Sequence, residues 1–348
     1  MGEHRMPAEW APQEALWVGW PWDRREWGPH FDGARAEIAD LVAALADPHP
    51  ETSAFDRIDL VTAPGEGRNA AETEFEAEIA EGRVRIIEAP IGDVWLRDTG
   101  PIVRLAADGR SAAGFAFNGW GGKYVMGEDA RIAEILAGDA DLPFHSYAPF
   151  VFEGGAIEVD GEGTAITTRR CVLNPNRNPG LAEADVEQVL QDALGIERVL
   201  WLDDGLAFDH TDGHVDNVVR FLATGLVAVQ RSTGADDPNA ALFAEVAKTL
   251  AGAVDAGGRA IRFVDIPSPG RIETDGEPVA ASHMNFVISN GLIAAPHYVE
   301  AGGDERAAEE AFDLLMDAGP RERGVMLPSH NIVGGGGSFH CITQQRPR

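Results

Sequence analysis

The sequence has little cysteine: Cys171 and Cys341 are the only two among 348 residues. Two cysteines cannot form the disulfide framework of a small secreted domain, and they lack zinc-type spacing with the histidines. The chain also lacks an apolar run long enough to cross a bilayer, and residues 1–6 lead into no apolar signal segment. We therefore expect a cytoplasmic protein that does not bind membranes.

Basic residues are scarce as well. Lys and Arg total 28 against 57 Asp and Glu, which gives a formal net charge of -29. Nucleic acids and anionic membranes are bound through basic patches, so we expect neither as a partner. An acidic field can attract a small cationic substrate, although an excess of acid also serves solubility alone.

What the sequence does contain is a repeat of supersecondary structure. Between residues 100 and 328, two strand-like segments flank a turn four times, and a helix and a further strand follow each pair. The turns are Asp108-Gly109, Asp160-Gly161, Thr224-Gly225 and Asn290-Gly291. The helices are predicted over residues 128–136, 182–194, 240–251 and 305–316.

A fifth copy can be assembled from the two ends of the chain. The N-terminal part predicts a strand at 15–20, helices at 33–46 and 69–80, and strands at 58–61 and 84–87, and the last strand is expected around Cys341. Repetition of this kind predicts a single α/β domain over residues 1–348, with its units arranged radially about an axis. An open α/β sheet is the alternative, but frequent hairpins fit poorly with βαβ crossovers.

Polar residues gather directly before the predicted hairpins. Asp98, Glu153 and Asp216 each precede one, His214 stands beside Asp216, and Cys341 follows the glycine cluster 334–337. Radial repetition brings equivalent positions to the axis, so we expect these groups to share one pocket. Each also has a structural interpretation, such as a surface ion pair between Arg97 and Asp98 or turn chemistry around Glu153 and His214.

Three clustered carboxylates cannot all ionise at low cost unless a cation lies among them. Hard metal ions prefer oxygen ligands and have no use for a thiol, whereas a planar guanidinium suits two or three carboxylates. A thiol that faces the guanidinium carbon can act as a nucleophile, because nearby positive charge favours the thiolate. We therefore expect a small guanidino substrate and no metal. Cys171 we interpret as a packing residue and His210 as structural.

Several segments together resemble the agmatine deiminases, a group that includes microbial enzymes labelled peptidylarginine deiminases. The resemblance runs in order from residue 6 to residue 345. Its segments are 6–10 (MPAEW), 95–101 (WLRDTGP), 117–124 (FNGWGGKY), 153–155 (EGG), 173–179 (LNPNRNP), 211–216 (TDGHVD) and 340–345 (HCITQQ).

The resemblance implies a five-bladed α/β propeller, the pentein fold, and the hydrolysis of agmatine to N-carbamoylputrescine and ammonia without a cofactor. It implies that Cys341 is the nucleophile and His214 the general acid and base, through a covalent thiouronium intermediate. Asp98 and Asp216 would bind the guanidinium, and Glu153 would orient it and His214. The family also suggests a homodimer. His210, His283 and Ser338-Phe339 depart from the commonest family pattern.

Other functions remain open at this point. Trp95 could line the site for the substrate tail, and an excess of acid suits an amine tail better than the α-carboxylate of arginine. A deiminase of free or peptidyl arginine and an amidinotransferase are the chemical alternatives. A non-catalytic polyamine- or arginine-binding module would keep the carboxylates but would not need Cys341 and His214 together.

Overall fold

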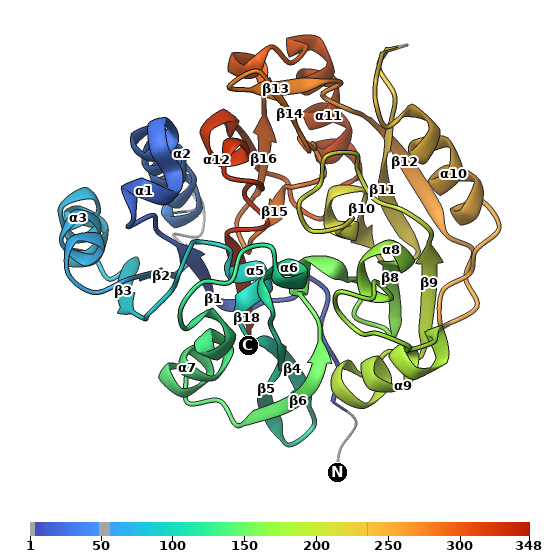
Figure 1. Cartoon of the computed structure of the whole chain (residues 1–348), viewed down its shortest axis with the longest axis horizontal. Coiled ribbons are helices and arrows are strands. Elements are labelled where there is room, and N and C mark those ends of the chain that lie inside the picture. The colour runs from blue at the N-terminus through green and yellow to red at the C-terminus, as the bar shows by residue number, and fades with distance from the viewer. Residues whose placement is uncertain (1–3, 49–55, 235) are drawn as a thin grey trace.

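The computed structural model describes residues 4–48, 56–234 and 236–348, in which short sheets alternate with helices (Figure 1). The sheet that follows residue 100 shows the order of strands and helix that the later sheets repeat. Strands β4 (Ile102–Ala106) and β5 (Gly109–Ala116) pair antiparallel, and β6 (Phe144–Val151) pairs parallel to β5 after helix α7 (Ile132–Asp139). Gly109 has φ +140°, which lets the hairpin turn there.

The same order of elements recurs three more times. In each case the first two strands are antiparallel and the third is parallel to the second. The second sheet contains β7 (Glu158–Val159), β8 (Thr164–Thr168), α9 (Glu183–Leu194) and β9 (Arg198–Leu202). The third contains β10 (Val219–Ala223), β11 (Leu226–Arg231), α10 (Ala240–Leu250) and β12 (Arg262–Pro267). The fourth contains β15 (Val287–Ile288), β16 (Ile293–His297), α11 (Glu305–Ala318) and β17 (Gly324–Pro328).

Distant parts of the sequence meet in the remaining large sheet. Its strand order is β18 (Thr343–Pro347), β1 (Gln13–Gly19), β2 (Ile58–Thr62) and β3 (Val84–Glu88), with helix α2 (Phe31–Ala46) between β1 and β2 along the chain. The β1–β18 pair is antiparallel and the others are parallel. The expected α/β class is confirmed, and within the described residues each sheet is separate and none closes on itself.

Two local expectations were wrong. The helix predicted at 69–80 is divided into α3 (Glu66–Glu74) and α4 (Glu76–Ala80), because Phe75 leaves the helical conformation. Its ring is buried against Trp20, with ring centroids 5.2 Å apart, so tertiary packing overrides local propensity. The last strand begins at Thr343, so Cys341 lies in the turn that precedes it. A small hairpin, β13 (Ile272–Thr274) with β14 (Glu277–Val279), was not predicted.

Charged residues are buried near the first strands of these sheets. The guanidinium of Arg220, in β10, forms ion pairs with Glu9 and Glu158 and donates to the carbonyls of Met284 and Phe286. Such burial is tolerated only where the hydrogen bonds are complete. Arg97 is also buried and donates to Gln344 and Gln345, which rules out a surface ion pair with Asp98.

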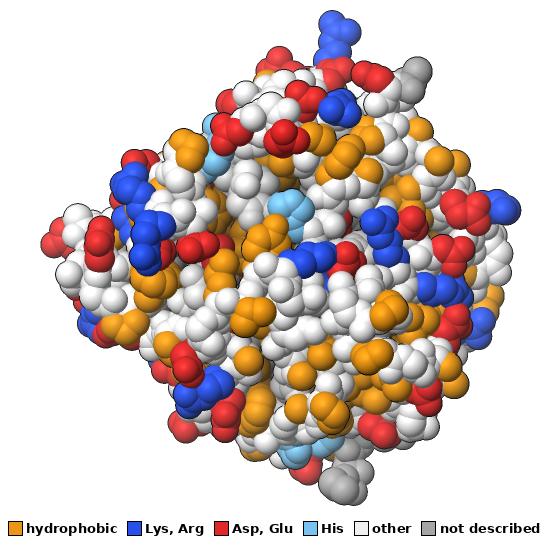
Figure 2. Space-filling model, in the orientation of Figure 1, with side chains coloured by type: hydrophobic (Ala, Val, Ile, Leu, Met, Phe, Trp, Pro, Cys, Tyr) orange, Lys and Arg blue, Asp and Glu red, His pale blue; other side chains and the backbone are white. Residues whose placement is uncertain are grey.

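The surface itself is mixed in charge. On the face shown in Figure 2, basic side chains are scattered among acidic ones and gather in no broad patch. None of the helices in the described part of the chain has the length and apolar character needed to span a bilayer.

The buried His283 makes the free energy of unfolding depend measurably on pH. Burial lowers its pKa to about 4, its Nδ1 lies 2.8 Å from the carbonyl of Pro267 and its ring stacks on Tyr298. The unfolded chain binds this proton below about pH 6.5, whereas the folded chain resists it. Lowering the pH from 7 to 5 should therefore reduce the unfolding free energy of the native protein by about 2 kcal/mol more than it reduces that of His283→Gln.

Urea unfolding at both pH values measures this difference. His145→Gln, the same substitution at an exposed position, provides the control. An identical pH dependence in His283→Gln and the native protein would contradict the assignment.

Candidate active site

The predicted site residues lie at equivalent places, each just ahead of the first strand of a sheet. Asp98 is in the short helix α5 (Leu96–Thr99) before β4, and Glu153 precedes the 3₁₀ helix η3 (Gly154–Ala156) and β7. Asp216 is in η4 (Val215–Asn217) before β10, with His214 at its N-terminal boundary. Cys341 occupies the turn before β18.

The corresponding position before β15 belongs to Asn285, whose role the sequence did not reveal. Its Nδ2 lies 3.1 Å from Sγ of Cys341, and its Oδ1 accepts from the backbone N–H of His340 at 2.9 Å. Sγ of Cys341 also lies 4.0 Å from Oδ2 of Asp216. The five larger sheets of the described residues therefore all contribute to one constellation.

Glycine residues allow these segments to approach one another. A side chain on Gly155 would place its Cβ 2.6 Å from Nδ1 of His214, and one on Gly337 would place it 3.1 Å from Sγ of Cys341. The backbone N–H of Gly155 donates to Oδ1 of Asp98 at 3.0 Å. The glycines beside Glu153 and Cys341 thus make room for the functional groups.

Cys341, Asp98 and Trp95 line a cavity of about 230 Å³. The lining residues that the sequence did not assign are Glu26, Trp27, Asp93, Trp120, Tyr124, Met126, His210, Thr211 and Gly334 to Gly336. Two other hollows, near Arg170 and near Gln188, are larger, but neither is lined by a histidine or a cysteine.

Aromatic rings form much of the cavity wall. Trp27 and Trp95 stack with ring centroids 5.9 Å apart, and both indole N–H groups donate to the carboxylate of Asp93. Trp120 has φ +52° and donates from Nε1 to Oδ2 of Asp98 at 2.8 Å. Trp120 stands among three glycines at 119–122, in a segment that carries the resemblance, but no role was predicted for it from the sequence.

The structural interpretation of His210 was wrong. Its side chain is exposed and lines the cavity, with its ring stacked on Tyr124 at a centroid distance of 5.8 Å. The hydroxyl of Tyr124 lies 3.1 Å from Nδ1 of His210, and Lys123 donates to the His210 carbonyl.

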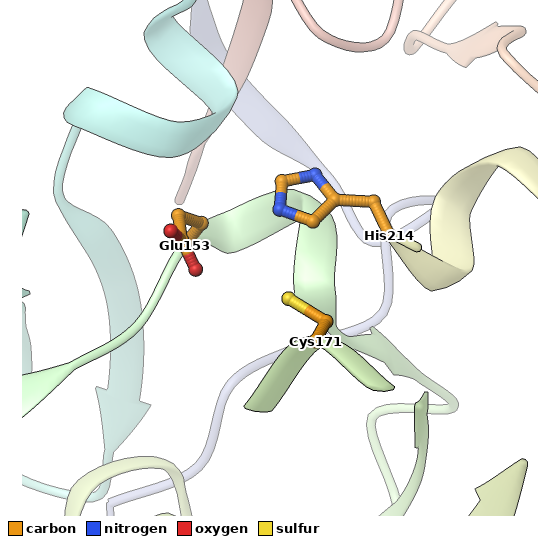
Figure 3. A group of neighbouring side chains, drawn as sticks. All are labelled: Glu153, Cys171 and His214. Atoms are coloured by element: carbon orange, nitrogen blue, oxygen red, sulfur yellow. The ribbon is translucent and has the colours of Figure 1, made fainter. Parts of the chain in front are cut away.

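His214, Asp216 and Glu153 do not line the cavity but lie directly behind it. Nδ1 of His214 is 3.8 Å from Oδ1 of Asp98. Glu153 pairs with the buried Arg177 at 2.8 Å and lies, with Cys171, beside the His214 ring (Figure 3). Cys171 belongs to a buried apolar cluster, in agreement with its interpretation as a packing residue.

Asp216 connects the site to the buried charges of the fold. Its Oδ2 lies 2.7 Å from Nδ1 of His340, and Nε2 of His340 lies 3.1 Å from Oε2 of Glu9. Glu9 also pairs with Arg220. Neither Glu9 nor His340 was singled out from the sequence, although both stand in the segments that carry the resemblance.

Burial and negative charge set the protonation of these groups. Burial raises the pKa of Cys341 well above its ordinary value, and the carboxylates of Asp216 and Asp98 add to that effect. Burial alone would lower the pKa of His214, but Asp98, Cys171 and Asp216 outweigh it and raise that pKa well above its ordinary value. Burial opposes ionisation of Asp216, yet the hydrogen bond with His340 holds its pKa below the usual range.

The site at neutral pH therefore combines a protonated His214 imidazole, a neutral Cys341 thiol and the ionised carboxylate of Asp216, whereas burial raises the pKa of Asp98. The positive charge that favours the thiolate was expected from the bound guanidinium, and the protein's own groups do not supply it, because carboxylates dominate around Sγ. A bound cation would supply that charge.

Comparison with known proteins gives a consistent result. Residues 5–347 match the family described as Porphyromonas-type peptidyl-arginine deiminase. The agmatine deiminase of Pseudomonas aeruginosa strain LESB58 is 35% identical, with 99% of this chain and 95% of that protein covered. The solved agmatine deiminase of Enterococcus faecalis superimposes with a TM-score of 0.89 at 28% identity, over 99% of this chain and 96% of that one.

A more distant structure supports the fold alone. A dimethylarginine dimethylaminohydrolase superimposes with a TM-score of 0.52 at 12% identity, covering 96% of this chain and 99% of that chain.

The raised pKa of Cys341 predicts how the rate of its alkylation depends on pH. Alkylation by iodoacetamide should still be accelerating beyond about pH 9 in the absence of a cationic ligand, because only the thiolate reacts. Asp216→Asn removes one of the charges that raise the pKa, so the midpoint of the pH–rate profile should move down. The variant Cys341→Ala measures the background alkylation of Cys171. An alkylation rate that levels off below pH 8 in the native protein would contradict the raised pKa of Cys341.

Proposed function

Because the chain belongs to the Porphyromonas-type peptidyl-arginine deiminase family, we propose that it hydrolyses a guanidino compound to a urea and ammonia. Agmatine is the leading substrate, with N-carbamoylputrescine as the product. The observation that carries the proposal is the placement of the Cys341 thiol beside Asp216 and in one cavity with Asp98. A thiol between carboxylates suits attack on a planar cation that those carboxylates hold.

Substrate binding starts the reaction by changing the electrostatics. A guanidinium held by Asp98 and Asp216 places positive charge next to Sγ and opposes the two carboxylates that raise the thiol pKa. The thiol loses its proton to solvent only when the substrate is present. The free enzyme thereby keeps its nucleophile protonated and protected from other electrophiles.

The two half-reactions then use one imidazole. The Cys341 thiolate adds to the guanidinium carbon, and protonated His214 gives its proton to one nitrogen, which leaves as ammonia. The product is a covalent thiouronium and a neutral His214, which next removes a proton from water as that water adds to the same carbon. Collapse breaks the C–S bond, and the proton of the new hydroxyl returns to the sulfur. Such acid–base assistance contributes about 10²–10⁴ in rate.

The cavity wall favours an amine at the far end of the substrate. Stacked Trp27 and Trp95 offer apolar surface to a methylene chain, and Glu26 and Asp93 add negative charge. Among the described lining residues none is Lys or Arg, so the wall offers no lysine or arginine to pair with the α-carboxylate of arginine. This supports agmatine over free arginine as the substrate.

The proposal also covers the domain organisation, the oligomeric state and the location of the protein. Five sheets, each preceded by at least one residue of the site, support a five-bladed propeller formed by a single catalytic domain. A homodimer and a cytoplasmic location complete the proposal.

Ammonia release from agmatine, free arginine and an arginine peptide tests the function directly. We expect release from agmatine that Cys341→Ala abolishes. Ammonia release from another guanidine would identify a different substrate for the same hydrolytic reaction. Binding of agmatine without release would indicate a binding module, and amidine transfer to an added amine would indicate an amidinotransferase.

Gly155 provides a test of the geometry behind the cavity. Gly155→Ala inserts a methyl group 2.6 Å from Nδ1 of His214 and 2.9 Å from Oδ1 of Asp98. Since a displacement of about 1 Å can cost about 100-fold in rate, we expect kcat to fall by at least about tenfold. The matched control is Gly138→Ala in α7, where a Cβ meets nothing within 4 Å. Equal activity of both variants would contradict the assigned geometry.

A further inference from the structure

A buried arginine that the proposed reaction does not use lies next to the site. The Arg177 side chain is fully buried and pairs through Nε with Oε1 of Glu153 at 2.8 Å. Its Nη1 donates to Oδ2 of Asp212 at 2.5 Å and to Oδ1 of Asn176 at 2.9 Å. Its Nη2 donates to the carbonyl of Thr211 at 2.8 Å. A guanidinium with this many partners is fixed in one orientation.

The carboxylate of Glu153 depends on this arginine. The Glu153 side chain is buried, and among the described residues Arg177 is the side chain that donates to it. One oxygen of the same carboxylate lies within 4.8 Å of a ring nitrogen of His214 (Figure 3). A buried carboxylate that loses its cation takes up a proton or moves, because an uncompensated buried charge is costly. Arg177 therefore keeps Glu153 both charged and in place beside the imidazole.

Asp212 holds a second part of the guanidinium. Its φ of +66° lies in the left-handed region, which costs free energy and persists where surrounding contacts maintain it. Oδ1 of Asp212 pairs with Lys123 at 2.6 Å, and Oδ2 accepts from Asn176 at 2.9 Å as well as from Arg177. Burial would raise the pKa of Asp212, but these hydrogen bonds hold it below its usual range. Arg177 thus has a charged and fixed anchor at neutral pH.

A different buried arginine shows what a purely structural role looks like. Arg104 in β4 is also buried, and it donates to Ser111, Tyr147 and the carbonyl of Ala193. None of these residues lines the cavity that holds the nucleophile. Arg177 differs because its carboxylate partner lies beside the imidazole of the site.

We propose that Arg177 is a positioning residue of the reaction, which acts on His214 through Glu153. The effect on rate rests on the proposed function, whereas the placement of Glu153 does not. In both half-reactions His214 exchanges a proton with a group at the guanidinium carbon, so a displaced ring slows each of them. The guanidinium of the substrate is assigned to Asp98 and Asp216, which among the described residues form no hydrogen bond with Arg177. Loss of Arg177 should therefore lower kcat and leave KM nearly unchanged.

Steady-state kinetics of Arg177→Lys tests the effect on rate. Lysine keeps the charge but cannot reach Glu153, Asp212 and the Thr211 carbonyl at once. We expect kcat for agmatine to fall by at least about tenfold, with KM within about threefold of the native value. The control is Arg104→Lys, the same substitution at a buried arginine away from the site, which should keep the native kcat. A native kcat in Arg177→Lys, or a loss confined to KM, overturns the proposal.

A double-mutant cycle tests whether Arg177 acts through Glu153. Glu153→Gln removes the charge that Arg177 holds, so adding Arg177→Lys should lower kcat by less than about twofold further. Two losses that simply multiply would give Arg177 a merely structural role and overturn the proposal. Asp212→Asn covers a folding defect of Arg177→Lys, because asparagine suits the left-handed backbone. It should lower kcat in the native background and leave that of Glu153→Gln unchanged.

A measurement without turnover separates this proposal from the proposed function. Crystal structures of Cys341→Ala and of Cys341→Ala/Arg177→Lys should show the Glu153 carboxylate displaced from the His214 ring by about 1 Å or more in the second variant. An unchanged separation of Glu153 and His214 overturns the positioning role, whatever the activity. If the displacement is found but the native protein releases no ammonia from any guanidine, the proposed function fails and the placement of Glu153 by Arg177 stands.

Discussion

Burial of charge at the centre of the molecule is the constraint on which the rest depends. Arg220 is enclosed by Glu9 and Glu158, His340 lies between Glu9 and Asp216, and Arg177 pairs with Glu153. Each ion loses several kcal/mol of hydration in such a place and is stable only with complete partners. The network compensates these groups but leaves the carboxylates of Asp98 and Asp216 beside the cavity. The negative charge that faces Cys341 is therefore a property of the fold as a whole.

This arrangement divides the catalytic machinery between the protein and its ligand. The protein supplies the thiol, the imidazole and the carboxylates in fixed positions, held by short helical turns and by close contacts at Gly155 and Gly337. The cation that lowers the pKa of the thiol comes with the substrate. Selectivity for cationic guanidines then arises in activation as well as in binding, because a neutral ligand of the same shape would leave Cys341 protonated.

The sequence was sufficient for features that local patterns determine. Glycine turns and helical periodicity predicted the hairpins and helices of the repeats, and radial repetition placed Asp98, Glu153, Asp216 and Cys341 near one another. It was insufficient where contacts join distant segments. The break at Phe75 depends on Trp20, and the Arg177 partner of Glu153 and the place of Cys171 behind His214 follow from tertiary packing. The protonated thiol was missed because charge depends on distances, which residue types alone do not give.

The pairing of β1 with β18 has a consequence for biosynthesis. Residues Gln13 and Pro347 are partners in this ladder, so one edge of β1 stays unpaired while almost the whole chain is translated. An exposed edge of this kind can pair with another nascent chain, which makes the interval before β18 emerges the time of greatest risk of aggregation. Cys341 enters its place together with β18. A chain in which β18 has not yet paired with β1 therefore lacks a complete active site.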